Sequence, residues 1–360
     1  MKKFQIQIFI ILFIILEKLI LIPVIKYNIT LANKNNPYIE TLENLESPYF
    51  EMMKKTNRKI LWSFGTSRSF PFYFLPVDKT SDVDKYLLPK EKFELKKWEF
   101  FTFSALGSNP AIYYTRFLQL LERGLLPEKI VLEVSPFSFN KNNLYNKTTQ
   151  TEGIPLDLAM KNFLDFPLSY TSEIIYSRVF ATARYKISIK KMKNIWDKKN
   201  TEIDLDYFFK IALQKKEKTN KLYSDLDYED INLENKKPPT EDIRFTKMVD
   251  LIDEYFYKNW KLDESQIYFL EKIIERSKQR NIPVILWRPK VYEEGKNSYK
   301  KFKVENVFQE EMKRISKKFS IPYMDFNESN LSKCNYFRDA SHLSPRCYTE
   351  LGYQLTKLSQ

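Results

Sequence analysis

Two patterns of apolar residues alternate along most of the chain. Short and nearly all-apolar runs predict buried strands, and apolar positions at helical spacing predict helices that cover them. The runs lie at residues 60–64, 100–103, 130–134, 282–287 and 321–326, and the helical patterns at 111–123, 263–280 and 307–319. Helices that alternate with fully apolar strands indicate a parallel sheet covered on both faces. We therefore predict the α/β class, as a three-layer α/β/α sandwich with a parallel sheet.

The alternation stops between residues 140 and 239. This stretch is rich in Lys, Asp, Tyr and Asn, with helical fragments at 156–164 and 172–190 and a charged tract at 215–237. We interpret 140–239 as a mostly helical insertion or cap over the active-site edge of an α/β domain formed by 58–139 and 240–360. For residues 215–239 the alternative is a solvated, partly disordered linker.

The N-terminus is apolar behind a basic start. Lys2 and Lys3 precede apolar residues 4–16, and after Glu17 and Lys18 the apolar pattern continues over 19–25. Roughly 22 residues of this kind approach the length that spans a bilayer. We predict a single transmembrane helix within residues 1–26, with the N-terminus inside, a connecting segment at 27–57 and the remainder outside the cytoplasm. A cleaved signal peptide and a buried helix are the alternatives.

Composition fits one large domain and leaves the partner open. Hydrophobic residues make up 43% of the chain, which includes 28 Phe and 23 Tyr, and the net charge is +13. The charge either favours anionic polymers and lipid headgroups or reflects a general abundance of lysine. No phosphate-binding glycine loop, helix-turn-helix pattern or zinc spacing accompanies it, so we expect no nucleic-acid partner.

Candidate chemistry begins with the single histidine, His342, which follows Asp339 by three residues. Imidazole is the side chain whose unperturbed pKa lies near neutrality, and a neighbouring carboxylate orients it. Far upstream, the run that ends at Phe64 leads into Gly65-Thr66-Ser67, where the glycine permits a tight turn out of a strand. Ser67 is therefore the candidate nucleophile. The alternative is that Ser67 or Ser69 only caps the next helix.

Together these segments resemble the SGNH (GDSL-type) hydrolase superfamily, in which a serine follows the first strand and Asp-x-x-His closes the domain. The resemblance implies that Ser67 attacks an acyl carbonyl, that His342 takes its proton and that Asp339 orients His342. Gly107, in a segment that follows residues 100–103, matches the glycine of the second block, whose N–H group helps to bind the oxyanion. The chain resembles membrane-anchored bacterial branches of this superfamily that act in acyl transfer to cell-surface polymers.

Two positions depart from the family pattern. Thr66 stands where the family usually has aspartate, and Ser135-Pro136 stands where its third block has Gly-x-Asn-Asp. The oxyanion would then depend on the N–H groups of Ser67 and Gly107, with Ser135 as a further candidate. Loss of one such donor costs about 2.7–4 kcal/mol of transition-state stabilisation.

The expected function is serine acyl transfer, as an esterase or an O-acyltransferase on a cell-surface glycan or polymer. The alternative is a non-catalytic binding or scaffold protein of the cell envelope that has kept the fold. Arg68 and Arg288 are candidate substrate-binding residues, although Arg288 at a strand end can equally brace a loop.

The two cysteines, Cys334 and Cys347, bracket the Asp-His motif and form either a disulfide or two buried thiols. With so few metal-ligating residues we expect no metal site, and no cofactor is implied.

Overall fold

The computed structural model describes residues 2–30, 46–75, 87–105, 107–143, 153–197, 231–232, 245–328 and 330–357. The chain divides into two compact units. One unit comprises Met1–Glu40 and Lys147–Asn220, and the other comprises Thr41–Asn146 and Lys221–Gln360. The helical part of the predicted insertion therefore belongs with the N-terminal helices, and the sheet lies in the second unit.

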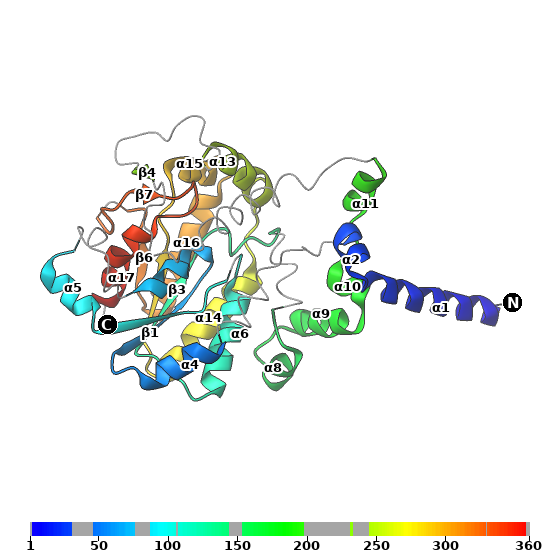
Figure 1. Cartoon of the computed structure of the whole chain (residues 1–360), viewed down its shortest axis with the longest axis horizontal. Coiled ribbons are helices and arrows are strands. Elements are labelled where there is room, and N and C mark those ends of the chain that lie inside the picture. The colour runs from blue at the N-terminus through cyan, green and yellow to red at the C-terminus, as the bar shows by residue number, and fades with distance from the viewer. Residues whose placement is uncertain are drawn as a thin grey trace. The chain divides into compact units, whose positions relative to one another are not determined.

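The sheet of the second unit has five strands in the order β2-β1-β3-β5-β6, and all its neighbours pair in parallel. Figure 1 labels β1, β3 and β6 of this sheet. Its members are β1 (Lys59–Phe64), β2 (Trp98–Thr102), β3 (Lys129–Glu133), β5 (Val284–Arg288) and β6 (Tyr323–Asp325). The α/β class with a parallel sheet is confirmed. The central strands β3 and β5 are buried at every residue, as expected of a parallel sheet.

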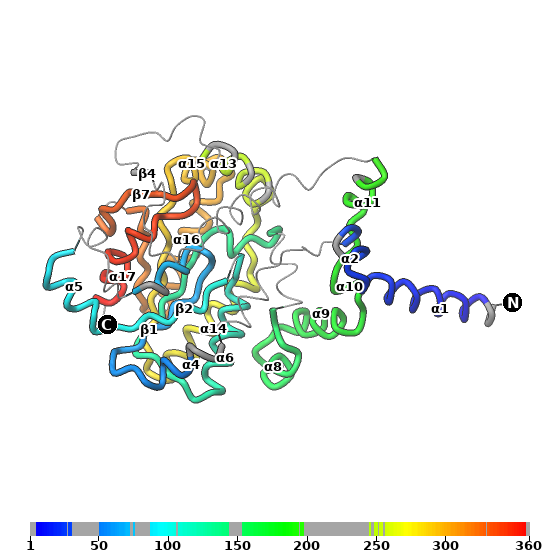
Figure 2. The backbone as a smooth tube through the Cα atoms, in the orientation of Figure 1, coloured from blue at the N-terminus to red at the C-terminus, as the bar shows by residue number. Residues whose placement is uncertain are grey.

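Aromatic contacts show that helices cover both faces of this sheet. On one face, Phe64 of β1 lies against Tyr113 of α6 (Pro110–Glu122). On the other face, Phe100 of β2 stacks on Phe72, which in turn meets Tyr348 of α17 (Tyr348–Lys357). Phe100 pairs with Leu61, so the side chains of these two residues lie on the same face of the sheet. Side chains alternate along a strand, and Leu61 and Phe64 are an odd number of positions apart on β1, so Phe64 lies on the opposite face. Figure 2 shows α17, in red, beside α5 (Pro89–Leu95), in cyan.

Local signals explain where two of the long helices of this unit begin. Asn109 caps α6 by accepting the Ile112 N–H group at 3.2 Å, and Pro110 occupies its first turn. Gly124 follows that helix with φ +70°. In the same way Asp263 caps α14 (Glu264–Lys278) through the N–H group of Ser265. Both helices are confirmed within two residues of the prediction.

The second unit has further elements, of which α16 (Val304–Phe319) is the longest. They are α4 (Glu46–Lys55), η1 (Ser67–Phe74), β4 (Ile231–Asn232), α13 (Thr246–Ile252), η2 (Asp253–Tyr257), α15 (Glu293–Lys301), α16 (Val304–Phe319), β7 (Tyr336–Phe337) and η3 (Pro345–Cys347). Strand β4 pairs with β7 in a separate antiparallel sheet. Ile231 and Asn232 of β4 are the only residues of the tract 215–239 that the structure describes.

The first unit consists of helices. They are α1 (Lys2–Ile20), α2 (Pro23–Ile29), α8 (Leu156–Lys161), α9 (Leu168–Val179), α10 (Ala181–Tyr185) and α11 (Ile189–Trp196). The single helix predicted over 172–190 is wrong, because the chain is extended at Phe180 and takes φ +49° at Lys186. Helices α1 and α2 contact each other, as do α9 and α10, α1 and α10, and α2 and α11.

The membrane-spanning helix predicted within residues 1–26 is not supported. Among the residues described, no helix combines the length and the apolar character needed to cross a bilayer. The apolar stretch is divided by a turn at Leu21 and Ile22, after which Pro23 begins α2. Helix α1 also includes Glu17 and Lys18.

Candidate active site

The candidate site lies at the carboxyl edge of the sheet, where β1 and β3 end. After β1 the chain forms β2 on one side of β1, and then crosses to form β3 on its other side. In open α/β sheets such a reversal of strand order creates a crevice outside the carboxyl ends of the strands, and ligands bind there. Ser67 follows β1 at this point, and Glu133 ends β3.

The turn after β1 presents Ser67 without using its hydroxyl group as a cap. Thr66 is the N-cap of η1, and its hydroxyl oxygen accepts the Arg68 N–H group at 3.3 Å. The alternative in which Ser67 caps the helix is therefore wrong. Ser67 is half-buried, and its Oγ atom is directed to His342.

A fully buried carboxylate holds this turn from the neighbouring strand. Glu133 accepts hydrogen bonds from the Thr66 N–H group at 2.8 Å, the Thr66 hydroxyl at 2.6 Å and the Ser69 hydroxyl at 2.7 Å. Both carboxylate oxygens are engaged, as a buried charge requires. Glu133 therefore positions the backbone on either side of Ser67.

Gly65 makes room for this arrangement. A Cβ atom at position 65 would lie 1.9 Å from Ser69 Oγ and 2.5 Å from Glu133 Oε2. Both distances are far below van der Waals contact. A side chain at position 65 would therefore displace Ser69 from its hydrogen bond to Glu133. The glycine of the Gly-Thr-Ser segment is needed here for close approach of neighbouring groups.

Asp339 and His342 lie on a tight hairpin loop. The Arg338 N–H group donates to the His342 carbonyl at 3.0 Å, and the Ser344 N–H group donates to the Tyr336 carbonyl at 2.8 Å. Inside the loop, Asp339 Oδ1 accepts the N–H groups of Ser341 and His342, each at 2.8 Å. This turn, closed by an aspartate side chain, folds the chain back so that the imidazole lies over the carboxylate.

The two segments meet through a continuous chain of hydrogen bonds. Ser67 Oγ lies 2.8 Å from His342 Nε2, although the residues are 275 positions apart. His342 Nδ1 lies 2.9 Å from each oxygen of Asp339. Burial alone would raise the pKa of Asp339, but the charge of His342 and hydrogen bonds from its ring and from two N–H groups outweigh burial, so this pKa lies below its ordinary value. Asp339 therefore stays ionised and can stabilise a protonated His342.

Arg68 links the serine turn to the histidine loop. Its Nε atom donates to the Ser341 carbonyl at 3.0 Å, and its own carbonyl accepts the Tyr348 hydroxyl. Burial alone would lower the pKa of the Arg68 guanidinium, but Tyr299, Tyr257 and other neighbours more than offset it, and its pKa is raised. Within the part of the chain that the structure describes, the buried Nη1 atom of Arg68 has no hydrogen-bond partner.

Arg288 lies in a different setting. Its guanidinium donates from Nη1 and Nη2 to Glu305 at 2.7 Å each, and from Nη1 to Asp325 at 3.0 Å. These are the contacts of a brace between β5, β6 and α16, and the structure does not bring Arg288 into contact with Ser67, Asp339 or His342.

The three predicted oxyanion donors follow three adjacent strands. Gly107 follows β2 with φ +64°, and the Ala105 N–H group two residues earlier donates to the Gly65 carbonyl at 3.2 Å. Ser135 follows β3, and its hydroxyl lies 3.4 Å from that of Ser138. Among the described residues the N–H groups of Ser67 and Ser135 have no acceptor.

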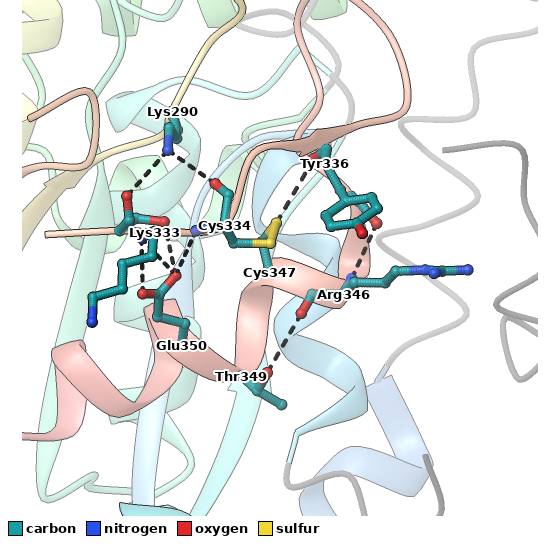
Figure 3. Close-up of a disulfide and its surroundings, with 10 residues drawn as sticks. Lys290, Lys333, Cys334, Tyr336, Arg346, Cys347, Thr349 and Glu350 are labelled. Carbon is teal, nitrogen blue, oxygen red and sulfur yellow. Dashed lines mark hydrogen bonds between the residues drawn. A yellow bond between two sulfur atoms is a disulfide. The ribbon is translucent and has the colours of Figure 1, made fainter. Parts of the chain in front are cut away.

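A disulfide closes the segment that carries the hairpin loop. Cys334 and Cys347, the chain's two cysteines, are joined across 13 residues, with Cα atoms 5.4 Å apart. Figure 3 shows how its surroundings are tied down: Lys290 Nζ donates to the Cys334 carbonyl at 2.9 Å, and Glu350 accepts the Cys334 N–H group at 3.1 Å. The disulfide thus fixes both ends of the segment that contains Asp339 and His342.

For three residues, a role in the site was not predicted from the sequence. Ser69 and Glu133 hold the serine turn, and Ser341 places its hydroxyl 2.9 Å from His342 Nδ1. Glu133 carried a usable signal, because it is the single charged residue in the apolar run 130–134. A charge in a buried strand has to be paired with specific partners. Ser69 and Ser341 gave no such signal.

Fold and site together define an α/β protein with a hydrogen-bonded serine, histidine and aspartate at the switch point of its sheet. A family model described as "Protein of unknown function (DUF1574)" matches residues 6–357, so the chain belongs to the DUF1574 family. No curated protein matches the chain. Within the described ranges, no group of three His, Cys, Asp or Glu side chains is arranged to hold a metal ion.

Proposed function

We propose that this protein is an SGNH-like serine acyl-transfer enzyme. One observation carries the proposal: the hydrogen-bonded chain from Ser67 through His342 to Asp339, with distances of 2.8 and 2.9 Å. A serine, a base within reach of it and a carboxylate that orients the base are the parts that nucleophilic acyl transfer requires. Ser67 and His342 are only half-buried, so an ester can reach them.

The reaction would proceed in two halves. Ser67 Oγ attacks the ester carbonyl while His342 Nε2 takes the hydroxyl proton, and Asp339 stabilises the resulting imidazolium. The N–H groups of Ser67, Gly107 and Ser135 are the candidate hydrogen-bond donors to the oxyanion. Collapse expels the alcohol, which receives the proton from His342. An incoming hydroxyl group then loses its proton to His342 and attacks the acyl group. The bond from the acyl group to Ser67 Oγ breaks, and Ser67 takes the proton back from His342.

The incoming hydroxyl belongs either to water, which makes the protein an esterase, or to a cell-surface glycan or polymer, which makes it an O-acyltransferase. A location outside the cytoplasm is supported by the Cys334–Cys347 disulfide, since such bonds persist in oxidising compartments. The net charge of +13 suits an anionic polymer.

A fluorophosphonate probe tests the proposal directly, because it modifies only serines that are activated as nucleophiles. We expect labelling of the purified full chain, and its loss in Ser67→Ala and in His342→Ala. Ser104→Ala is the matched control: it removes a buried hydroxyl group that follows β2 and has no partner among the described residues, so labelling should persist. If labelling persists in Ser67→Ala, the modified serine lies elsewhere and the proposal fails.

The second candidate is a non-catalytic binding or scaffold protein of the cell envelope. The observation that favours it is Ser135-Pro136, which replaces the asparagine donor of the SGNH pattern. A wild-type chain that is folded, as judged by a cooperative unfolding transition, and that still fails to react with the probe would support this candidate.

A further inference from the structure

Helix α11 separates its apolar and basic residues onto opposite sides. At about 100° per residue, four side chains share one face: Ile189, Met192, Ile195 and Trp196. The lysines occupy the remaining surface: Lys190, Lys191 and Lys193. Lys191 and Lys193 flank the apolar face on its two edges, and the eight residues of the helix include no acid.

The apolar face of α11 is not covered by the described residues. Its side chains have exposed fractions of 80% for Ile189, 46% for Met192, 54% for Ile195 and 88% for Trp196. Single exposed apolar residues are ordinary, but a continuous face of four marks a surface that binds something.

The same unit holds this helix in place and adds a second apolar surface. The Ser188 N–H group donates to the Ile29 carbonyl at 2.8 Å, and Ile187 forms an antiparallel bridge with Thr30, so the start of α11 is fixed to the end of α2. Helix α1, which precedes α2, exposes apolar side chains along its length, and Figure 1 shows it extending away from α2 and α10.

The one acidic residue of α1 is engaged within the unit. The Glu17 carboxylate accepts the N–H groups of Ala181 and Thr182 and the hydroxyl of Thr182 at the start of α10. The Glu17 carboxylate is therefore hydrogen-bonded to α10. The exposed surface of α1 between Lys3 and Glu17 is apolar except for Gln5 and Gln7.

We propose that α11 docks in the headgroup layer of a bilayer that contains anionic lipids, with its apolar face toward the acyl chains. Apolar side chains on one side, lysines on the other and a tryptophan at the end are the properties of helices that lie in a membrane interface. Lysines at both edges of the face match a surface of dense negative charge better than the single groove of a partner protein.

This inference extends the envelope location proposed above but does not depend on acyl transfer. Variants of α11 should react with the fluorophosphonate probe as the wild type does, because none of the exposed α11 side chains belongs to the candidate active site. An α11 variant that loses membrane binding but keeps labelling bears on the membrane proposal alone. A Ser67 variant that loses labelling but keeps membrane binding bears on the acyl-transfer proposal alone.

The test is quenching of tryptophan fluorescence in the full chain by vesicles that contain brominated phosphatidylcholine, with and without phosphatidylglycerol. Trp196 is the most exposed of the chain's tryptophans, and a Trp196→Phe variant establishes its share of the signal. We expect quenching that requires phosphatidylglycerol and weakens at high salt. Replacing the three lysines of α11 by Gln should weaken binding by about fivefold for each charge, or about a hundredfold in all.

Two triple variants test the apolar face with Trp196 kept as the reporter. Ile189→Ser, Met192→Ser and Ile195→Ser together should weaken binding by about tenfold or more. The matched control, Phe163→Ser, Leu164→Ser and Leu168→Ser, removes side chains of similar exposure from the same unit and should bind as the wild type does. Equal weakening by both, or quenching independent of phosphatidylglycerol, overturns the proposal. A concentration-dependent shift of Trp196 emission without vesicles would assign the face to a second copy of the chain and overturn it also.

Discussion

Thr66 and Glu133 are joined by two hydrogen bonds, one from the Thr66 N–H group at 2.8 Å and one from its hydroxyl at 2.6 Å. This pair accounts for one departure from the SGNH pattern. An aspartate at position 66 would place a second carboxylate against the buried Glu133, and like charges in contact destabilise each other. Threonine at 66 and glutamate at 133 are therefore a matched combination.

Substitutions of Thr66 and Glu133 should have non-additive effects on the free energy of unfolding. Thr66→Asp should lower the free energy of unfolding by about 3 kcal/mol, because it creates an uncompensated buried charge. Glu133→Gln should cost about 1–3 kcal/mol, since its amide group faces donors. In the double variant the amide introduced at position 133 can donate to the carboxylate introduced at position 66. We expect urea unfolding to show a favourable coupling energy of about 1–3 kcal/mol, whereas simple additivity would contradict the pairing.

Two glycine-to-alanine changes should have opposite outcomes. Gly65→Ala should destabilise the fold and abolish probe labelling, because its Cβ atom would lie 1.9 Å from Ser69 Oγ. Gly295→Ala is the control: its Cβ atom would lie 3.5 Å from the Ala340 carbonyl oxygen, an ordinary contact, within helix α15. There we expect a neutral change or a gain of about 0.5–1 kcal/mol. Thermal unfolding and labelling of both variants give the comparison, and equal effects would refute the role of Gly65.

Asp339→Asn should reduce the rate of probe labelling by about 10⁴-fold. The amide oxygen can still accept the N–H groups of Ser341 and His342, which keeps the loop folded. The amide nitrogen would then face His342 Nδ1 and favour the tautomer that protonates Nε2, so that His342 can no longer accept the Ser67 proton. Rates over a probe concentration series measure the loss. A change of less than about tenfold would show that Asp339 does not orient His342.

Removal of the disulfide should destabilise the C-terminal segment. Replacing Cys334 and Cys347 by Ala opens a loop of 13 residues, for which chain entropy predicts a loss of about 3 kcal/mol. The loop contains Asp339 and His342, so labelling should fall as well. Unfolding of the wild type with and without a reducing agent provides the parallel measurement, and it should reproduce the effect. Identical midpoints in both conditions would show that the bond does not constrain the chain.

Lys129 should make stability depend on pH in the alkaline range. Burial and the charge of Lys59 lower the pKa of Lys129 to about 8, against about 10.4 in an unfolded chain. Between these values the unfolded state binds the extra proton, so the free energy of unfolding should rise from about pH 8 to about pH 10. Lys129→Met should reduce this rise. If the wild type shows no such rise, burial and Lys59 do not lower the pKa of Lys129 in the folded chain.

Most strands and long helices of the second unit could be predicted because each buries a regular set of apolar residues. The run at 130–134 and the cap at Asn109 are examples. Features decided by partners distant in the chain could not be predicted. Strand β4 exists through its pairing with Tyr336 and Phe337, and the role of Glu133 depends on Thr66 and Ser69.

The residues of the candidate site could likewise be predicted only in part. The order and spacing of Ser67, Asp339 and His342 carried enough information to propose a triad, whose geometry the structure then supplies. Arg68 could be named because it follows Ser67, but its contact with the Ser341 carbonyl depends on the folded hairpin loop. The apolar face of α11 was not predicted, because the helical fragment expected over 172–190 ended two residues into this helix.

The separation of 275 residues between Ser67 and His342 has a consequence for biosynthesis. A growing chain contains Ser67 long before His342 is synthesised, and His342 lies inside a loop that a disulfide closes. A chain that ends before His342 therefore cannot form the hydrogen bond to Ser67. The contact between Ser67 and His342 is therefore made after translation of the segment between them, when the two distant segments meet in the folded sheet domain.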